Sequence, residues 1–181
     1  MITVVSGTNR PGSRTLLFAR HFADQLRELG QKVQLLDLTE LAMADFAGEM
    51  YDPTTLSAHL LELQDRFILG ADRFAFFVPE YNGSYPGVLK LFIDAISVRE
   101  TNANFGGKYA ALVGIASGRA GNLRGMDHLG AALSHMGAWV LPAKLPISSI
   151  YGLLDNERVS DAKTTAALLQ HARDLVAAGT T

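Results

Sequence analysis

The sequence contains no cysteine among its 181 residues. This absence excludes a disulfide framework, a zinc or iron–sulfur centre held by thiolates, a thiol nucleophile and a cofactor attached through cysteine. Any redox chemistry must therefore use a cofactor that is bound without a link to cysteine. Hydrophobic residues make up 48% of the chain, which at this length is enough to bury one core. We therefore expect one domain, spanning residues 1–181.

The sequence also has little excess of charge. Sixteen basic and eighteen acidic residues give a formal net charge of -2. Such a balance provides neither a broad positive field for nucleic acid nor a polybasic surface for membranes, so the expected partners are small molecules or copies of the same chain. The apolar run that begins at Met1 lacks a preceding basic region and is too short for a signal peptide or a membrane span, so we expect a cytoplasmic location.

Short apolar runs alternate with segments of helical spacing along the chain. Runs typical of buried parallel strands are Ile2–Val5, Val33–Leu36, Phe74–Val78, Tyr109–Ala116 and Trp139–Leu141. Strict alternation of strands and helices requires crossover helices, which cover both faces of a parallel sheet. The sequence therefore predicts an α/β fold with a doubly wound sheet. Five strands favour a flavodoxin-like order, 2-1-3-4-5, over a six-stranded dinucleotide fold.

The helices have recognisable end signals. The first apolar stripe is predicted to end near Gly30, in the position of a left-handed C-cap. A second helix is predicted to begin with Asp52 as N-cap and Pro53 at the first helical position. The irregular segment Asp37–Tyr51 is expected at the surface near the ligand mouth. Further helices are expected at 86–98, 122–136 and 157–178.

The loop after the first strand is predicted to bind a phosphate. In open parallel sheets the ligand crevice lies beyond the carboxyl ends of the strands, and the start of the following helix favours an anion. Polar donors in this loop are Thr8, Arg10, Ser13 and Thr15. Ser13 stands where a Walker A loop needs lysine, and Asn9 replaces the second glycine of a dinucleotide fingerprint, so one phosphate fits best. The alternative is a polar turn in which Ser13 is an ordinary N-cap.

The loop after the third strand carries the most specific motif. Residues 79–90 read Pro-Glu-Tyr-Asn-Gly-Ser-Tyr-Pro-Gly-Val-Leu-Lys, a fixed turn that would present amides and a flat wall to a planar ligand. Together, the two loops resemble those of the NADPH-dependent FMN reductase family. That family binds the FMN phosphate with a Gly-Ser-x-Arg-x-x-Ser-x-Asn loop and sets a Pro-Glu-Tyr-Asn-Gly-Ser-x-Pro-Gly-x-Leu-Lys segment against the isoalloxazine. The second motif is matched throughout, whereas the first departs at Thr8 and Thr15.

The resemblance implies a set of site residues. The first loop would hold the FMN phosphate with Thr8, Arg10, Ser13, Arg14 and Thr15. The second would contact the ring with Pro79, Glu80, Tyr81, Asn82 and Gly83. The third, after the fourth strand, would approach the pyrimidine end with Ser117, Gly118 and Arg119, although its glycines also suit a flexible turn. Arg119 and Arg124 are free to face solvent or to attract the phosphates of a nicotinamide.

The resemblance also implies an activity. It predicts non-covalently bound FMN, NADPH or NADH as electron donor, and ping-pong transfer to a small acceptor such as free flavin, a quinone, an azo compound or a metal oxyanion. Hydride chemistry of this kind needs no catalytic side chain, and the five histidines lack the spacing of a metal site. A flavodoxin-type electron carrier and a non-enzymatic nucleotide-binding module remain alternatives.

Assembly is the last expectation. Members of the family are dimers or dimer pairs, so we expect a homodimer or homotetramer. The helices after strands three and four should form the contact, because they carry many apolar residues: Leu89, Phe92, Ile93, Ile96, Met126, Leu129, Leu133 and Met136. Tyr81, Tyr85 and Trp139 would then lie near the partner. The alternative is that both helices are simply buried in the monomer. Lys90 and Asp94 are expected to form a surface ion pair.

Overall fold

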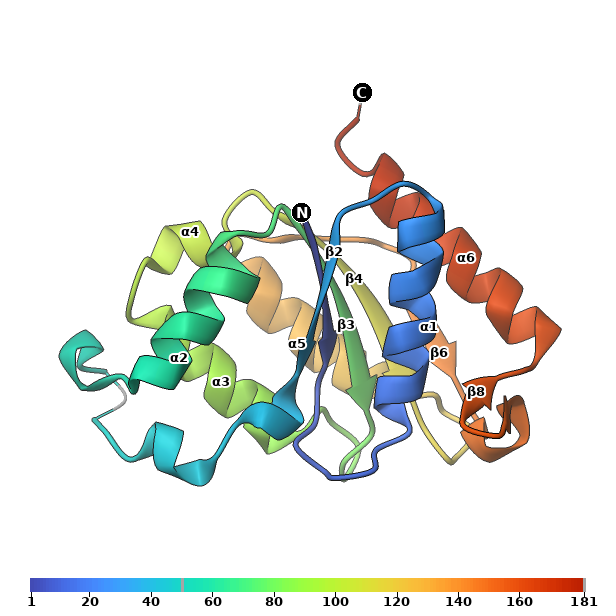
Figure 1. The fold of residues 1–181 in the computed structure, drawn as a ribbon, viewed down its shortest axis with the longest axis horizontal. Helices are drawn as coiled ribbons and strands as arrows, with labels where there is room; N and C mark the ends of the chain where they lie inside the picture. Colours follow the sequence, from blue (N-terminus) through green and yellow to red (C-terminus); the bar gives the residue numbers. More distant parts are fainter. Residues whose placement is uncertain (50, 181) are drawn as a thin grey trace.

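The computed structural model describes residues 1–49 and 51–180. Its central parallel sheet has the order β2-β1-β3-β4-β5, which confirms the predicted doubly wound α/β fold (Figure 1). Each predicted strand lies within one residue of its observed bounds. The strands are β1 (Ile2–Ser6), β2 (Val33–Asp37), β3 (Arg73–Pro79), β4 (Tyr109–Ile115) and β5 (Trp139–Val140).

The fifth position of the sheet holds a broken strand, which the sequence analysis did not anticipate. A further strand, β6 (Leu145–Ile147), pairs with the last part of β4, whereas β5 pairs with its first part. Four residues separate Val140 from Leu145, but only two separate their partners on β4, Ala110 and Val113. Pro142 lies in the longer segment between Val140 and Leu145. Because it has no N–H to donate to the neighbouring strand, the pairing stops there and resumes after it.

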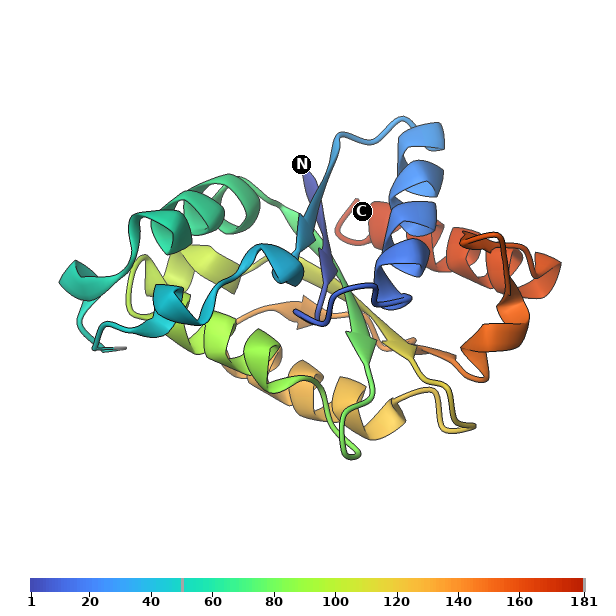
Figure 2. The ribbon, with the colours of Figure 1, turned by 60° about the horizontal axis from the view of Figure 1, so that its bottom comes forward.

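Helices cover both faces of the sheet (Figure 2). One face carries α1 (Thr15–Glu28) and α6 (Ala162–Ala177), and the other carries α2 (Ala58–Leu63), α3 (Gly87–Ser97), α4 (Thr101–Phe105) and α5 (Leu123–His135). Successive side chains of a strand point to opposite faces, so Phe76 joins the core under α3 and α5 while Phe77 joins the core under α1 and α6. Within the described residues, no helix is both long and apolar enough to cross a bilayer.

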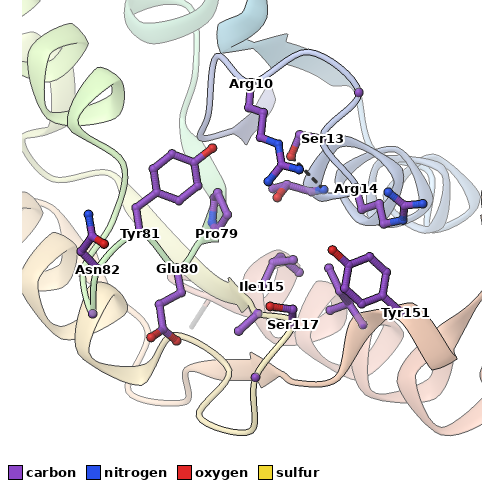
Figure 3. Close-up of a pocket in the computed structure, with 16 residues that line it drawn as sticks. Arg10, Ser13, Arg14, Pro79, Glu80, Tyr81, Asn82, Ile115, Ser117 and Tyr151 are labelled. Carbon is purple, nitrogen blue, oxygen red and sulfur yellow. Dashed lines mark hydrogen bonds between the residues drawn. The ribbon is translucent and has the colours of Figure 1, made fainter.

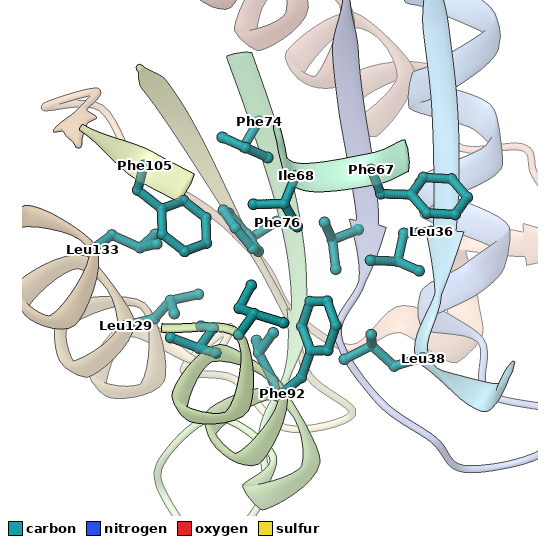
Figure 4. Close-up of a cluster of buried hydrophobic side chains, with 14 of the residues drawn as sticks. Leu36, Leu38, Phe67, Ile68, Phe74, Phe76, Phe92, Phe105, Leu129 and Leu133 are labelled. Carbon is teal, nitrogen blue, oxygen red and sulfur yellow. The ribbon is translucent and has the colours of Figure 1, made fainter. Parts of the chain in front are cut away.

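The apolar side chains of α3 and α5 are buried inside the chain (Figure 4). Leu89, Phe92, Ile93, Ile96, Met126, Leu129 and Leu133 are 0–2% exposed, and Met136 is partly buried against the same cluster. These eight residues therefore leave little apolar surface for a second subunit, contrary to the expectation that part of it would meet one. The reason is that α2 and α4 complete the cover, so the cluster extends from Leu36 on β2 to Phe105 on α4.

The second predicted helix begins later than expected. The Asp52 carboxylate accepts a hydrogen bond from the Thr54 backbone at 2.8 Å, but the turn that it caps is a short 3-10 helix, Pro53–Thr55. Leu56 then adopts an extended conformation and packs on the core, so Ser57 becomes the N-cap of α2. The helix continues past α2 as a π-helical segment over Gln64–Leu69. The end of α1 agrees better with prediction, because Gly30 adopts φ +77° just beyond it.

The last predicted helix is shorter than residues 157–178. An antiparallel hairpin of β7 (Leu154–Asp155) and β8 (Arg158–Val159) overlaps the predicted start, and α6 begins only after it. The Asp161 carboxylate caps α6 by accepting a hydrogen bond from Thr164 N at 2.7 Å. Helical periodicity does not register this hairpin, because its strands contain two residues each.

Asn122 connects the start of α5 to the end of β3. Its side chain is buried, and Nδ2 donates to the carbonyl oxygens of Val78 at 2.9 Å and Pro79 at 3.0 Å. Its Oδ1 accepts from Gly125 N at 3.1 Å, which caps α5, and its backbone lies in the left-handed region at φ +57°. One side chain thus fixes the helix start and the carboxyl end of the neighbouring strand together.

Replacing Asn122 by alanine should lower the free energy of unfolding by about 2–4 kcal/mol. The variant loses an N-cap, leaves two buried carbonyls without their donor and places alanine at a positive φ. Urea denaturation would measure the change. Asn102→Ala, at an exposed asparagine of α4, is the matched control and should change stability by no more than about 0.5 kcal/mol. A loss at Asn122 as small as the control's would contradict this account.

Candidate functional site

A cavity of about 340 Å³ opens at the carboxyl edge of the sheet (Figure 3). The loops after β1, β3 and β4 surround it, as expected for a parallel sheet of this order. Its size falls in the range of about 300–1,000 Å³ that is usual for small-molecule sites. Eleven of the thirteen predicted site residues line it: Arg10, Ser13, Arg14, Thr15, Pro79, Glu80, Tyr81, Asn82, Gly83, Ser117 and Gly118.

The first loop brings the positive end of a helix to the cavity. Helix α1 begins at Thr15 behind its N-cap Arg14, whose side chain makes no capping hydrogen bond, and no acidic residue lies in the described first turn. The N-cap position is Arg14 and not Ser13, although the Ser13 hydroxyl accepts a hydrogen bond from Thr15 N at 3.3 Å. Arg10 and Ser13 lie at the same end of the cavity (Figure 3). This end offers hydroxyls, a guanidinium and the helix dipole to an anion.

The second loop is a tight two-residue hairpin. Asn82 and Gly83 have φ values of +53° and +77°, and Tyr81 and Ser84 exchange backbone hydrogen bonds of 2.9 and 3.0 Å. These features identify a type I′ turn, whose preferred sequence is Asn-Gly, and confirm that the step needs positive φ. The turn holds the wall of the cavity in place, and the backbone of Glu80 is tied to β4 by a 3.0 Å hydrogen bond to Ile115 O.

Thr8 does not line the cavity, although it belongs to the first loop. Its side chain is completely buried, and its hydroxyl lies 2.8 Å from the Tyr81 hydroxyl. The same Thr8 oxygen accepts a hydrogen bond from Arg10 N at 3.2 Å. Because its hydrogen-bonding capacity is used inside the protein, Thr8 joins the first loop to the second instead of facing a ligand. Tyr81 thereby connects both loops.

Arg119 is exposed and also lies outside the cavity lining, while its neighbours Ser117 and Gly118 contribute to it. Five further residues line the cavity that were not predicted from the sequence: Gly12, Ile115, Ala116, Ile150 and Tyr151. The last two come from the segment after β6, whose backbone is hydrogen-bonded to the third loop through Ser149 N to Gly118 O at 3.1 Å. The strand before this fourth loop, β6, has three residues, too few for hydrophobic periodicity to reveal it.

Other sequence candidates lie outside the cavity. The predicted ion pair is present, with Lys90 Nζ 2.6 Å from the Asp94 carboxylate, and this hydrogen bond raises the pKa of Lys90. His171 is buried in the core and burial lowers its pKa, whereas His128 lies at the surface with Nδ1 2.9 Å from Ser84 Oγ. The segment Asp37–Tyr51 is largely exposed, as expected, and none of its described residues lines the cavity.

Comparison with known proteins agrees with the geometry. The model of the NADPH-dependent FMN reductase family matches residues 1–152. An NAD(P)H-dependent FMN reductase of Pseudomonas aeruginosa is 33% identical over 141 residues, covering 75% of this chain and 76% of the relative. An NADPH azoreductase of a Bacillus species is 26% identical over 162 residues, covering 90% of this chain and 84% of the relative.

Solved structures show the same architecture. The flavoenzyme FerB, an NAD(P)H:(acceptor) oxidoreductase from Paracoccus denitrificans, superimposes with a TM-score of 0.79 at 25% identity, covering 97% of this chain and 94% of that chain. A flavodoxin from the domain Archaea shares the fold with a TM-score of 0.61 at 15% identity, covering 97% and 96% of the two chains. The family match over most of the chain decides the assignment: this protein belongs to the NADPH-dependent FMN reductase family.

Proposed function

We propose that this protein binds FMN without a covalent link in the cavity and uses it to pass electrons from NADPH or NADH to a small acceptor. One observation carries the proposal: a single cavity joins a helix start with no acidic residue in its described first turn, which suits a phosphate, to a rigid hairpin wall, which suits a flat ring. The family to which the chain belongs is described by the same cofactor, FMN, and the same electron donor, NADPH.

The phosphate end fits an FMN phosphate by its donor chemistry. Ser13 and Thr15 supply hydroxyls, and Arg10 supplies a guanidinium that can balance a dianion. The positive end of the α1 dipole favours the same charge. No carboxylate competes there among the described residues of the first turn.

The ring end fits a planar group. Pro79 and Tyr81 form one wall, and Ile115, Ala116 and Ile150 provide apolar surface nearby. Because the Asn82-Gly83 turn is closed by two backbone hydrogen bonds, the wall is rigid and orients a ring without a large entropy cost on binding. FMN itself supplies the hydride chemistry when it is bound, so the protein has to position the ring, exclude water from its inner face and leave the outer face open to the donor.

The proposal extends to the chemical class of the electron acceptor. The similar proteins include an NADPH azoreductase and an NAD(P)H-dependent FMN reductase, which supports azo compounds and free flavin as acceptors. Quinones and metal oxyanions have the same requirement, namely access to the open side of the ring. A ping-pong order follows, since one open face admits the nicotinamide and then the acceptor in turn.

Anaerobic reduction tests this function directly. Protein reconstituted with FMN should lose its flavin absorbance when NADPH or NADH is added, and an azo dye or a quinone should restore it. The measurement is an absorbance spectrum before and after each addition. A protein that holds FMN but stays oxidised with both nucleotides would be a flavodoxin-type carrier. A protein without flavin affinity would be a nucleotide-binding module of another kind, and either result would reject the proposal.

Arg10→Ala should weaken FMN binding by about 1.5–3 kcal/mol, because a charge-assisted contact to the phosphate is lost. Titration calorimetry would give the dissociation constants for FMN and for riboflavin, which has no phosphate. The matched control is Arg119→Ala, which removes an exposed arginine outside the cavity lining and should leave FMN affinity unchanged. If Arg10→Ala weakens riboflavin as much as FMN, the phosphate contact is not the cause.

We also propose that the protein is a homodimer or a pair of dimers. Since the apolar side chains of α3 and of α5 beyond its first residue are internal, the contact would use exposed apolar residues such as Leu123, at the start of α5, at 48% and Trp139 at 64% exposure. Light scattering at micromolar concentration should give a multiple of the 19.5 kDa chain mass. Leu123→Glu should shift the mass toward that of one chain, because a charge would have to be buried. A parent protein of one chain mass would reject the assembly.

A further inference from the structure

A second cavity of about 360 Å³ adjoins the first. The two share Gly12, Ser13, Arg14 and Tyr151 in their linings. The rest of the second lining comes from the first two turns of α1 and from the hairpin β7–β8. We call this second cavity the hairpin groove. Each volume alone is at the small end of the range for ligand sites, of about 300–1,000 Å³, so the joined pair suits a ligand with two parts.

The hairpin groove joins the first cavity at its phosphate end. All the shared residues belong to the first loop or to Tyr151, and none belongs to the second loop, which forms the ring wall. At the junction the Arg14 guanidinium lies 5.1 Å from the centroid of the Tyr151 ring, and Figure 3 shows the two side chains next to each other. A ligand that extends beyond the phosphate of FMN would therefore continue past this pair into the groove.

The groove has the donors and surfaces that an adenosine phosphate needs. Arg14 and Arg20 supply positive charge for a second phosphate. Further along α1, Arg27 pairs with Asp24 at 2.7 Å, whereas Arg20 has no carboxylate within ion-pair distance in the part of the chain that the structure describes. Tyr151, 60% exposed, offers an aromatic face for a base. Leucines of α1 and of the hairpin provide apolar surface beside it.

The tip of the hairpin adds a carboxylate. Asn156 and Glu157 line the groove and have φ values of +45° and +61°, the conformation of a type I′ turn. Glycine is preferred at the second of these positions, and a side chain there costs conformational energy. A carboxylate held at such a position beside a cationic groove can accept hydrogen bonds from ribose hydroxyls, the role acidic residues have in dinucleotide sites. The strained position of Glu157 thus has a chemical use in the groove.

We propose that the hairpin groove binds the adenosine monophosphate half of FAD, so that the protein accepts FAD as well as FMN. This inference rests on the proposed binding of FMN in the first cavity. The adenosine phosphate of a reduced nicotinamide nucleotide has similar chemistry, but its nicotinamide must reach the ring end, whereas the groove opens from the phosphate end. The Glu157 carboxylate would also repel the 2′-phosphate of NADPH. These two observations favour FAD.

Titration calorimetry of the flavin-free protein with FMN and with FAD tests the proposal. FAD should bind with an affinity within about tenfold of that of FMN, since the groove compensates for the added bulk. Arg20→Ala should raise the ratio of the dissociation constants, FAD over FMN, by about tenfold, because it removes a contact that only FAD makes. The matched control is Arg27→Ala on the same helix, which should leave this ratio unchanged.

The variant Glu157→Gly distinguishes an effect on FAD binding from an effect on stability. Glycine suits the positive φ at this position, so the melting temperature should stay equal or rise, while the FAD-to-FMN ratio should increase by several fold. A variant that gains stability but keeps the parental ratio would remove the carboxylate from the groove's function and overturn the proposal.

The outcomes distinguish this inference from the proposed function. If FMN bound tightly and FAD bound about a hundredfold or more weakly, the proposed binding of FAD in the hairpin groove would be wrong, while the proposed FMN site would stand. Failure of both flavins to bind would reject the function and the groove together. If Arg20→Ala left the ratio unchanged but raised the KM for NADPH or NADH, the groove would serve the electron donor, and the FAD proposal would be wrong.

Discussion

The parallel pairing of β1, β3 and β4 is the constraint on which the site depends. Parallel strands end at the same edge, so the loops that follow them must converge there, however distant they are in sequence. Two chemically different loops thereby meet: one that begins a helix without a side-chain cap among the described residues, and one that forms a closed hairpin. A phosphate and a flat ring, joined in one ligand, match this pair of surfaces.

Convergence alone does not hold loops in fixed positions, and buried hydrogen bonds complete the arrangement. The Thr8 and Tyr81 hydroxyls join the first two loops, and the Asn122 amide joins the end of β3 to the start of α5. The Asn122 hydrogen bonds are buried and the Thr8–Tyr81 hydrogen bond is partly buried, so loss of one partner in either contact leaves the other partner poorly satisfied. These residues act on a ligand through the loops that they position, without facing the cavity.

The broken outer strand has a comparable effect on the other side of the cavity. The interruption around Pro142 lets β6 resume pairing beside the end of β4, and the chain that leaves β6 carries Ile150 and Tyr151 into the lining. The hairpin that follows then forms the far side of the adjoining groove along α1. A fifth strand that ended at Leu141 and a helix that began at residue 157, as the periodicity predicted, would leave no hairpin to place there.

Much of the fold and part of the site were predictable from sequence, for local reasons. Buried strands such as Phe74–Val78 are continuous apolar runs, and α1 has a strong apolar stripe, so pattern alone located them. The Asn82-Gly83 step encodes its turn through the backbone conformations that these two residues tolerate. All thirteen predicted site residues belong to loops whose convergence follows from strand order, and eleven of them line the cavity.

Tertiary structure decided the rest, because it depends on what a residue meets across the fold. Thr8 turns inward because Tyr81 is there to share a hydrogen bond, and Arg119 faces solvent although its neighbours line the cavity. The apolar residues of α3 and α5 look the same in sequence whether a partner or the chain itself covers them, and only packing shows that the chain does. Tyr151 reaches the site through a short strand with too few residues for periodicity to detect. Sequence therefore determined the elements and their local chemistry, whereas the direction of individual side chains and the second cavity arose from long-range contacts that no local pattern records.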